Sequence, residues 1–103
     1  MDYCVTLIHG TFARRARWTR DDSTFCESLK AQLKASSLVL SQFDWSGWNS
    51  PGARGRAAQR LATELESTLV RYPGARQFVI GHSHGGAVAL KAVTVEPGLR
   101  KRI

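Results

Sequence analysis

Three short hydrophobic runs are separated along this chain by longer segments of mixed polarity. The runs cover residues 3–9, 38–44 and 77–80, and they are rich in β-branched and aromatic side chains, which is typical of buried strands. The first run is almost continuously apolar, as expected for a parallel strand that is covered on both faces. The second is less apolar, which places it nearer to an edge of the sheet.

Helical spacing of apolar residues fills the segments between these runs. A helix is predicted over residues 24–35, opening with a capping box from Thr24 to Glu27, and a longer one over residues 54–72. A third helix follows the last strand and reaches about Val95. The residues predicted on the buried faces of the first two helices are Phe25, Leu29 and Leu33, then Ala58, Leu61, Leu65 and Leu69.

The order β-α-β-α-β-α predicts an α/β protein with a small parallel sheet between two layers of helices. The crossovers are long enough for parallel pairing, and residues 1–103 are expected to form a single domain. If the first strand is central, the loops after the first and third strands meet at the carboxyl edge, where open α/β sheets bind ligands. Residues 13–22 read as a polar loop that carries Trp18 inward, and residues 99–103 read as a frayed basic tail.

The segment around Ser83 has the features of a nucleophile elbow. A predicted strand leads into Gly-x-Ser-x-Gly, and a helical pattern begins directly afterwards. Such a turn exposes the serine hydroxyl on a strained backbone. Gly81 and Gly85 are expected where a Cβ would collide with neighbouring backbone, and Gly86 is expected to let the helix pack close to the strand.

Together with Leu7-Ile8-His9-Gly10-Thr11-Phe12 after the first strand, this segment resembles the α/β-hydrolase superfamily, specifically its lipase- and esterase-like members. The resemblance spans nearly the whole chain but matches only the first half of a full domain. It implies that Ser83 is the nucleophile that attacks an ester or related acyl carbonyl. It also implies an oxyanion hole formed by the backbone N–H of His84 and by a second N–H, with Thr11 the first choice and Phe12 the second.

The other two members of a catalytic triad are missing from the expected places. In this fold an acid and then a histidine follow the serine, on strands beyond the third. After Ser83 the sequence offers only Glu96, about three turns down the next helix, and His84, which belongs to the elbow. We therefore expect a truncated hydrolase with little or no turnover on its own. The alternative is a non-catalytic binding or interaction module with the same fold.

Several side chains near these motifs could either support the structure of the loops or take part in the chemistry of the site. His9 is expected to hydrogen-bond backbone in its own loop, and His82 to support or line the pocket. Asp44 is expected to cap a loop. Aromatic residues of these loops either line a pocket for substrate or pack beneath the loops; they are Phe12, Trp45 and Trp48.

The composition and charge of the chain restrict the kinds of partner that we expect, but they do not identify one. The net charge of +7 comes mainly from arginines, but no nucleic-acid-binding motif accompanies it, so we expect a solvated basic surface and no specific nucleic acid. No transmembrane segment, signal peptide, metal or cofactor is predicted, and a cytoplasmic location is the default expectation. Cys4 and Cys26 are expected to be small buried hydrophobes. The expected partners are a small-molecule or lipid ester and, through an uncovered edge of the third strand, a second copy of the chain.

Overall fold

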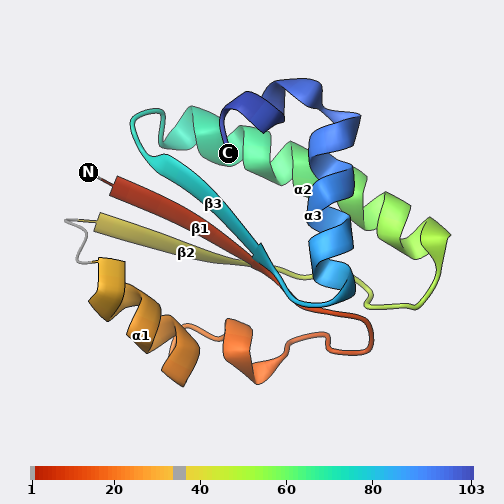
Figure 1. The fold of residues 1–103 in the computed structure, drawn as a ribbon, viewed down its shortest axis with the longest axis horizontal. Helices are drawn as coiled ribbons and strands as arrows, with labels where there is room; N and C mark the ends of the chain where they lie inside the picture. The colour runs from red at the N-terminus through yellow and green to blue at the C-terminus, as the bar shows by residue number, and fades with distance from the viewer. Residues whose placement is uncertain (1, 34–36) are drawn as a thin grey trace.

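The computed structural model describes residues 2–33 and 37–103, and its elements follow the predicted order. Three strands alternate with three α-helices, and two short 3₁₀ turns are added (Figure 1). The fold is therefore α/β, as predicted. The elements are β1 (Asp2–Ile8), η1 (Arg17–Thr19), α1 (Thr24–Leu33), β2 (Ser37–Phe43), α2 (Pro51–Arg71), β3 (Arg76–Gly81), α3 (His84–Val95) and η2 (Pro97–Lys101).

The sheet has the strand order β2-β1-β3, and both pairings are parallel. Ile8, the last residue of β1, is level with Phe43 of β2 and with Gly81 of β3. The three strands therefore end at one edge, and the loops after β1 and β3 meet there, as expected for a central first strand. β3 lies at the edge of the sheet.

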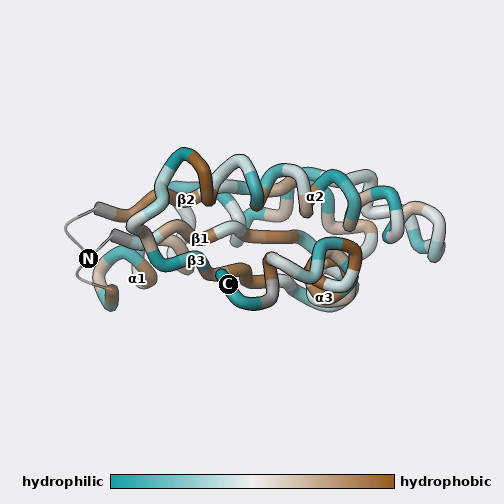
Figure 2. Tube along the Cα trace, turned by 90° about the horizontal axis from the view of Figure 1, so that it is seen from above, coloured by the Kyte–Doolittle hydropathy of each residue, from teal (hydrophilic) through white to brown (hydrophobic). Residues whose placement is uncertain are grey.

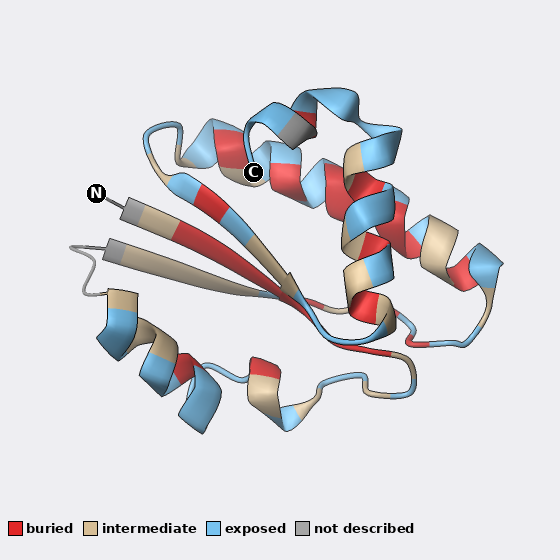
Figure 3. Cartoon of the chain, in the orientation of Figure 1, coloured by how far each residue is buried: buried red, intermediate tan, exposed pale blue. Residues whose placement is uncertain are grey.

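Both faces of β1 are buried, as its continuous apolar pattern predicted. Val5 and Leu7 pack with Cys26 of α1 on one face, whereas Ile8 packs with α2 and α3 on the other. Figure 1 shows α1 on one side of the sheet and α2 and α3 on the other, so the molecule has three layers. Figure 3 shows buried residues along β1 and along one side of α2.

The predicted apolar stripe of α2 is confirmed. Its members Ala58, Leu61, Leu65 and Leu69 are all buried. In Figure 2 the trace of α2 alternates between hydrophilic and hydrophobic residues, the pattern of an amphipathic helix. In α1, Leu29 and Leu33 pack against the sheet, but Phe25 is partly exposed and its ring contacts Trp18. Trp18 is thus turned inward, as predicted, and Cys4 and Cys26 are both buried.

The first helix begins at Thr24, as predicted, whereas the predicted start of the second helix was wrong; a serine one residue before each helix forms the cap. Ser23 caps α1: its Oγ accepts from the amide of Cys26 at 3.1 Å, so the predicted capping box at Thr24 does not form. α2 begins at Pro51 instead of residue 54, since Ser50 Oγ accepts from the amide of Ala53 and proline is suited to the first helical position. The predicted end of the first helix at residue 35 lies outside the described residues.

The prediction of a frayed C-terminal tail was also wrong. Residues 97–101 form η2, and the side chain of Leu99 is only 3% exposed within the core between α2 and α3. A single apolar residue in a basic segment gives no periodic signal, so only the packing reveals its role. No helix in the described part of the chain is long and apolar enough to cross a bilayer.

Candidate active site

Ser83 lies in the sharp turn between β3 and α3. Its backbone has φ 55° and ψ −124°, a positive-φ conformation outside the regions allowed to most residues, and it is strained for a residue with a Cβ. The amide of His82 still donates to Ile8 O, and the amides of Gly85 and Gly86 donate to the carbonyls of His82 and Ser83. The ladder of β3 therefore passes directly into the first turn of α3, and Ser83 between them is exposed.

Two of the three glycines around Ser83 are required by close backbone contacts. A Cβ on Gly81 would lie 2.5 Å from the nitrogen of Gly86, and a Cβ on Gly85 would lie 2.5 Å from Ile8 O. The predicted reason for these glycines is confirmed. For Gly86 the predicted reason was wrong, because the nearest atom to a Cβ there is 3.9 Å away. It is Gly85, facing the end of β1, that allows α3 to approach the sheet.

The turn after β1 packs against the elbow. A Cβ on Gly10 would lie 2.9 Å from His82 O and 3.2 Å from the Cβ of Ser83. The next residue, Thr11, places its hydroxyl in hydrogen-bond contact with Nδ1 of His84. The two motifs that sequence analysis singled out are thus in direct contact at the carboxyl edge of the sheet.

Three backbone amides near Ser83 were candidate donors, and they differ in how they are bonded. The amide of Phe12 donates to Gly47 O at 2.7 Å, so it is already engaged. Within residues 2–33 and 37–103, the amides of Thr11 and His84 have no backbone acceptor outside the helices and strands. His84 is the first residue of α3, where backbone amides point out of the helix end.

His9 is buried beneath the turn and both of its ring nitrogens are engaged. Nδ1 lies 2.9 Å from Gly10 O, Nε2 lies 3.1 Å from the amide nitrogen of Trp45, and the two rings stack at 5.4 Å. Nε2 also lies 3.1 Å from Trp45 O, so which nitrogen donates and which accepts depends on the tautomer of the ring. Trp45 Nε1 donates in turn to His9 O. The prediction that His9 bonds backbone in its own loop is confirmed, and Trp45 packs beneath that loop.

Asp44 binds side chains of the loop after β1, whereas the loop cap expected of it would accept from backbone amides. Arg14 Nε and Nη2 each lie 3.1 Å from Asp44 Oδ2, and His9 Nε2 lies 3.5 Å from Oδ1. The hydrogen bond from Arg14 lowers the pKa of Asp44, and the positive charge of Arg14 acts in the same direction. The carboxylate is therefore bound to the loop after β1 and is not directed at Ser83.

Some aromatic residues around the elbow are exposed on the surface of the loops, whereas others pack beside the elbow. Phe12 and Trp48 are 72% and 64% exposed and meet edge to face on the outside of the loops. On the other side, Trp18 stands 6.2 Å from the ring of His82, and the two border a hollow of about 280 Å³ with Phe25, Ile80 and Gly81. Sequence reasoning had not placed Trp18 beside the elbow; its only signal was a large aromatic residue in an arginine-rich loop.

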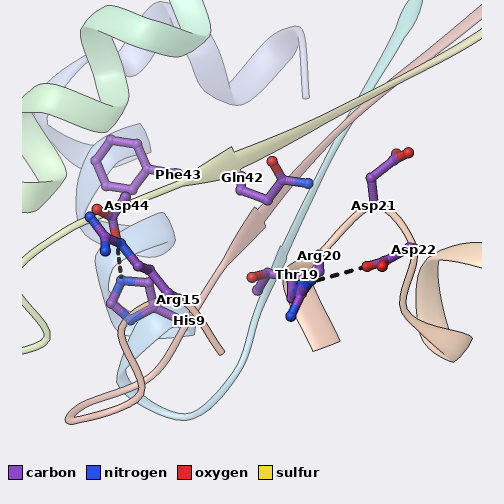
Figure 4. A pocket seen from close by; sticks show the side chains of 9 residues that line it. All are labelled: His9, Arg15, Thr19, Arg20, Asp21, Asp22, Gln42, Phe43 and Asp44. Atoms are coloured by element: carbon purple, nitrogen blue, oxygen red, sulfur yellow. Dashed lines mark ion pairs between the residues drawn. The ribbon is translucent and has the colours of Figure 1, made fainter. Parts of the chain in front are cut away.

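A cavity of about 680 Å³ lies on the β2 side of the site, and the residues that line it do not include Ser83 (Figure 4). Charged side chains dominate its rim, and its carboxylates are ion-paired: Asp22 with Arg20, Asp21 with Lys30 and Asp44 with Arg14. The remaining lining residues are His9, Arg15, Thr19, Gln42 and Phe43. Because Ser83 is elsewhere, proximity to the serine favours the smaller hollow beside His82 over this cavity as a substrate-binding surface.

The described residues do not provide a proton acceptor for Ser83. Its hydroxyl makes no hydrogen bond with any of them, His9 is fully engaged, and His84 Nδ1 is bonded to Thr11. Glu96 lies at the other end of α3, about 20 Å away at 1.5 Å per residue. In the same part of the chain, no three His, Cys, Asp or Glu residues are grouped so as to hold a metal ion.

The comparisons with known proteins agree with this geometry. A search of curated proteins found no match. A family model described as the alpha/beta hydrolase family matches residues 7–102, which include both motifs and every element from the end of β1 onward. The strand order, the strained serine turn after β3 and this match lead to one assignment: the chain belongs to the α/β-hydrolase family.

Proposed function

We propose that this chain carries the nucleophile and the oxyanion donors of a serine hydrolase that acts on ester or related acyl bonds. The observation that carries the proposal is the conformation of Ser83, whose positive φ exposes the residue at the N-terminus of α3. Residues with a strained backbone are found most often at functional sites, where the strain is part of the function. The adjacent turn packs against Ser83 at Gly10, and in this proposal it contributes the second oxyanion donor.

The proposed chemistry begins when Ser83 Oγ, having lost its proton to hydroxide, attacks an acyl carbonyl carbon and the carbonyl oxygen becomes an oxyanion. The oxyanion then collapses, the bond between the carbonyl carbon and the leaving oxygen breaks, and the leaving alkoxide takes a proton from water. A second water hydrolyses the acyl-serine, which releases the acid and restores the Ser83 hydroxyl. The amides of Thr11 and His84 are the proposed donors to the oxyanion. Thr11 is preferred to Phe12 because the amide of Phe12 is bonded to Gly47. One such donor contributes about 3–4 kcal/mol to the transition state.

The missing proton acceptor predicts how reactivity depends on pH. Without a general base, Ser83 reacts only as the small alkoxide fraction, which grows about tenfold per pH unit. A histidine base would instead give a plateau above its pKa. We therefore propose that the chain alone has low turnover and that its serine chemistry rises steadily into the alkaline range.

A fluorophosphonate probe tests this proposal. Ser83 Oγ would form an O–P bond while fluoride leaves and hydroxide takes the proton. We expect slow labelling that increases with pH, is lost in Ser83→Ala and is kept in Ser67→Ala, which removes an exposed hydroxyl of α2. Mass spectrometry of the labelled peptide gives the site. A plateau near neutral pH with robust hydrolysis of p-nitrophenyl acetate, both lost in Ser83→Ala, would show that the chain contains its own base.

A non-catalytic binding module is the second candidate function. It is favoured by the absence of any described hydrogen bond from the Ser83 hydroxyl to a base. In that case Ser83→Ala and the unmodified chain would show the same negligible labelling at every pH.

We further propose that the chain self-associates through β3. This strand lies at the edge of the sheet, and its Phe78 is 38% exposed beside the ring of Tyr3. An unpaired edge with apolar residues favours pairing with another strand. Sedimentation velocity should show a concentration-dependent dimer that Phe78→Lys weakens; a monomer at all concentrations with a cooperative melt would contradict this.

Two further expectations from the sequence remain predictions: that the substrate is a lipid ester, and that the protein is cytoplasmic.

A further inference from the structure

Thr11 and His84 are 73 positions apart in the sequence, yet their side chains are hydrogen-bonded. Thr11 follows Gly10 in the turn after β1, and His84 is the first residue of α3. The contact joins Thr11 Oγ1 to His84 Nδ1 and is partly buried. Each of these residues also carries one of the two backbone amides proposed above as donors.

We propose that the side chain of Thr11 is a positioning group, whose hydrogen bond to the His84 imidazole sets the spacing of the two oxyanion donors. The inference rests on the proposed hydrolase function and adds a role for two side chains. The amides would contact the oxyanion, whereas the hydroxyl and the imidazole would hold those amides in place.

The bonding of the turn supports this role. On its β2 side the turn is anchored by the bond from the Phe12 amide to Gly47 O, and internally by the bond from the Ala13 amide to Gly10 O. Toward α3, the Thr11–His84 bond is the one hydrogen bond that residues 10–13 make within the described chain. Turn and elbow also meet through close packing of Gly10 against His82 and Ser83.

Loss of this bond would leave the separation of the donors to packing alone. Packing contacts resist approach, but they do not prevent the turn and the helix from moving apart. A misplacement of about 1 Å in a reacting constellation can cost about 100-fold in rate. Hydrogen bonds to a developing charge are correspondingly sensitive to distance.

Substitutions of Thr11 separate the hydrogen bond from the shape of the side chain. Thr11→Val keeps the branched shape and removes the hydroxyl, whereas Thr11→Ser keeps the hydroxyl and removes a methyl group. We expect Ser83 labelling by a fluorophosphonate at alkaline pH to slow about 10- to 100-fold in Thr11→Val and to stay within about threefold in Thr11→Ser. His84→Ala should slow it similarly, and the double variant Thr11→Val/His84→Ala should be no slower than the slower single variant.

The matched control is Thr94→Val. Thr94 is an exposed threonine of the same helix, and its hydroxyl donates to Leu90 O one turn earlier. We expect its labelling rate to equal that of the unmodified chain. Thermal melts of all variants establish that each is folded under the labelling conditions.

A second measurement does not depend on labelling. In chain labelled with ¹⁵N-histidine, Thr11→Val should shift the Nδ1 resonance of His84 and leave that of His9 in place, and Thr11→Ser should preserve both. Equal labelling rates in Thr11→Val and the unmodified chain would overturn this inference and leave the proposed function intact. No Ser83-dependent labelling in the unmodified chain would overturn both, and a His84 resonance indifferent to Thr11→Val would show that the bond itself is absent.

Discussion

Gly10 lies directly against Ser83, although 72 residues separate the two along the chain. A Cβ built on Gly10 would be 3.2 Å from the Cβ of Ser83 and 2.9 Å from the carbonyl oxygen of the preceding His82. The turn after the central strand therefore forms one wall around the serine, and no side chain fits between them. This contact explains why a glycine stands at this position even though its backbone is not left-handed.

Gly10→Ala should push the turn away from the elbow. Because backbone of His82 must give way, we expect the free energy of unfolding to fall by about 1–3 kcal/mol in urea denaturation. Gly55→Ala is the control: a Cβ there meets no atom within 4 Å on α2, and alanine should stabilise the helix by about 0.5–1 kcal/mol. Equal stabilities for Gly10→Ala and the unmodified chain would contradict the contact.

Gly85 and Gly86 are adjacent but should respond oppositely to alanine. The added Cβ of Gly85→Ala would meet Ile8 O and His9 O at 2.5 and 2.6 Å, so α3 would have to move off the sheet, and we expect a loss of about 3 kcal/mol or more. Gly86→Ala meets nothing closer than 3.9 Å and should be neutral or stabilising by up to about 1 kcal/mol. Thermal denaturation of the pair measures the difference, and a similar loss in both would refute it.

Replacement of Ser83 should reveal the strain of its backbone. Glycine adopts φ 55° without the steric penalty of a Cβ, whereas alanine keeps that penalty. Both variants lack the hydroxyl, so their difference isolates the backbone. We expect Ser83→Gly to be more stable than Ser83→Ala by about 1 kcal/mol, part of the relief being offset by the greater flexibility of unfolded glycine. If Ser83→Ala proves the more stable, the turn is not strained.

The ion pair of Asp44 with Arg14 should stabilise the fold only above a threshold pH. Arg14 lowers the pKa of Asp44 in the folded chain below its ordinary value of 3.8, so the unfolded chain binds the proton more readily. The stabilisation by the ion pair is therefore complete above pH 3.8 and is lost as the pH falls through the lower pKa that Asp44 has in the folded chain. Because the side chain of Asp44 is 40% exposed, we expect Asp44→Asn to cost only about 0.5 kcal/mol near neutral pH.

Urea denaturation of both chains across this pH range measures the effect. The difference between Asp44→Asn and the unmodified chain should shrink below pH 3.8. Arg14→Gln should behave in the same way, and the two substitutions should not be additive. A difference that stays constant down to low pH would mean that the carboxylate is not stabilised by its charge.

Leu99 should make the C-terminal segment part of the cooperative fold. Its side chain is buried against α2 and α3, so Leu99→Ala should lower the free energy of unfolding by about 2–4 kcal/mol. Ile103→Ala, at a position that is 37% exposed, should cost less than about 1 kcal/mol. A negligible effect of Leu99→Ala in the same denaturation experiment would indicate that the C-terminal segment is frayed, as the sequence predicted.

The sequence by itself determined the order of the elements, their parallel pairing and the elbow. Residues 3–9 are almost continuously apolar, which already indicates cover on both faces, and Gly81-His82-Ser83-His84-Gly85 lies between a strand pattern and a helix pattern. These features are local, because they depend on side-chain periodicity and on backbone freedom at single positions.

Only the tertiary structure decided what touches Ser83. The contact of Gly10 with Ser83, the bond between Thr11 and His84, the engagement of the Phe12 amide by Gly47 and the burial of Leu99 all join residues far apart in the chain. No periodicity encodes such contacts, since they arise where the loops after β1 and β3 are brought to one edge of the sheet. The strand order β2-β1-β3 therefore fixed the neighbours of the serine, whereas the local sequence fixed only its turn.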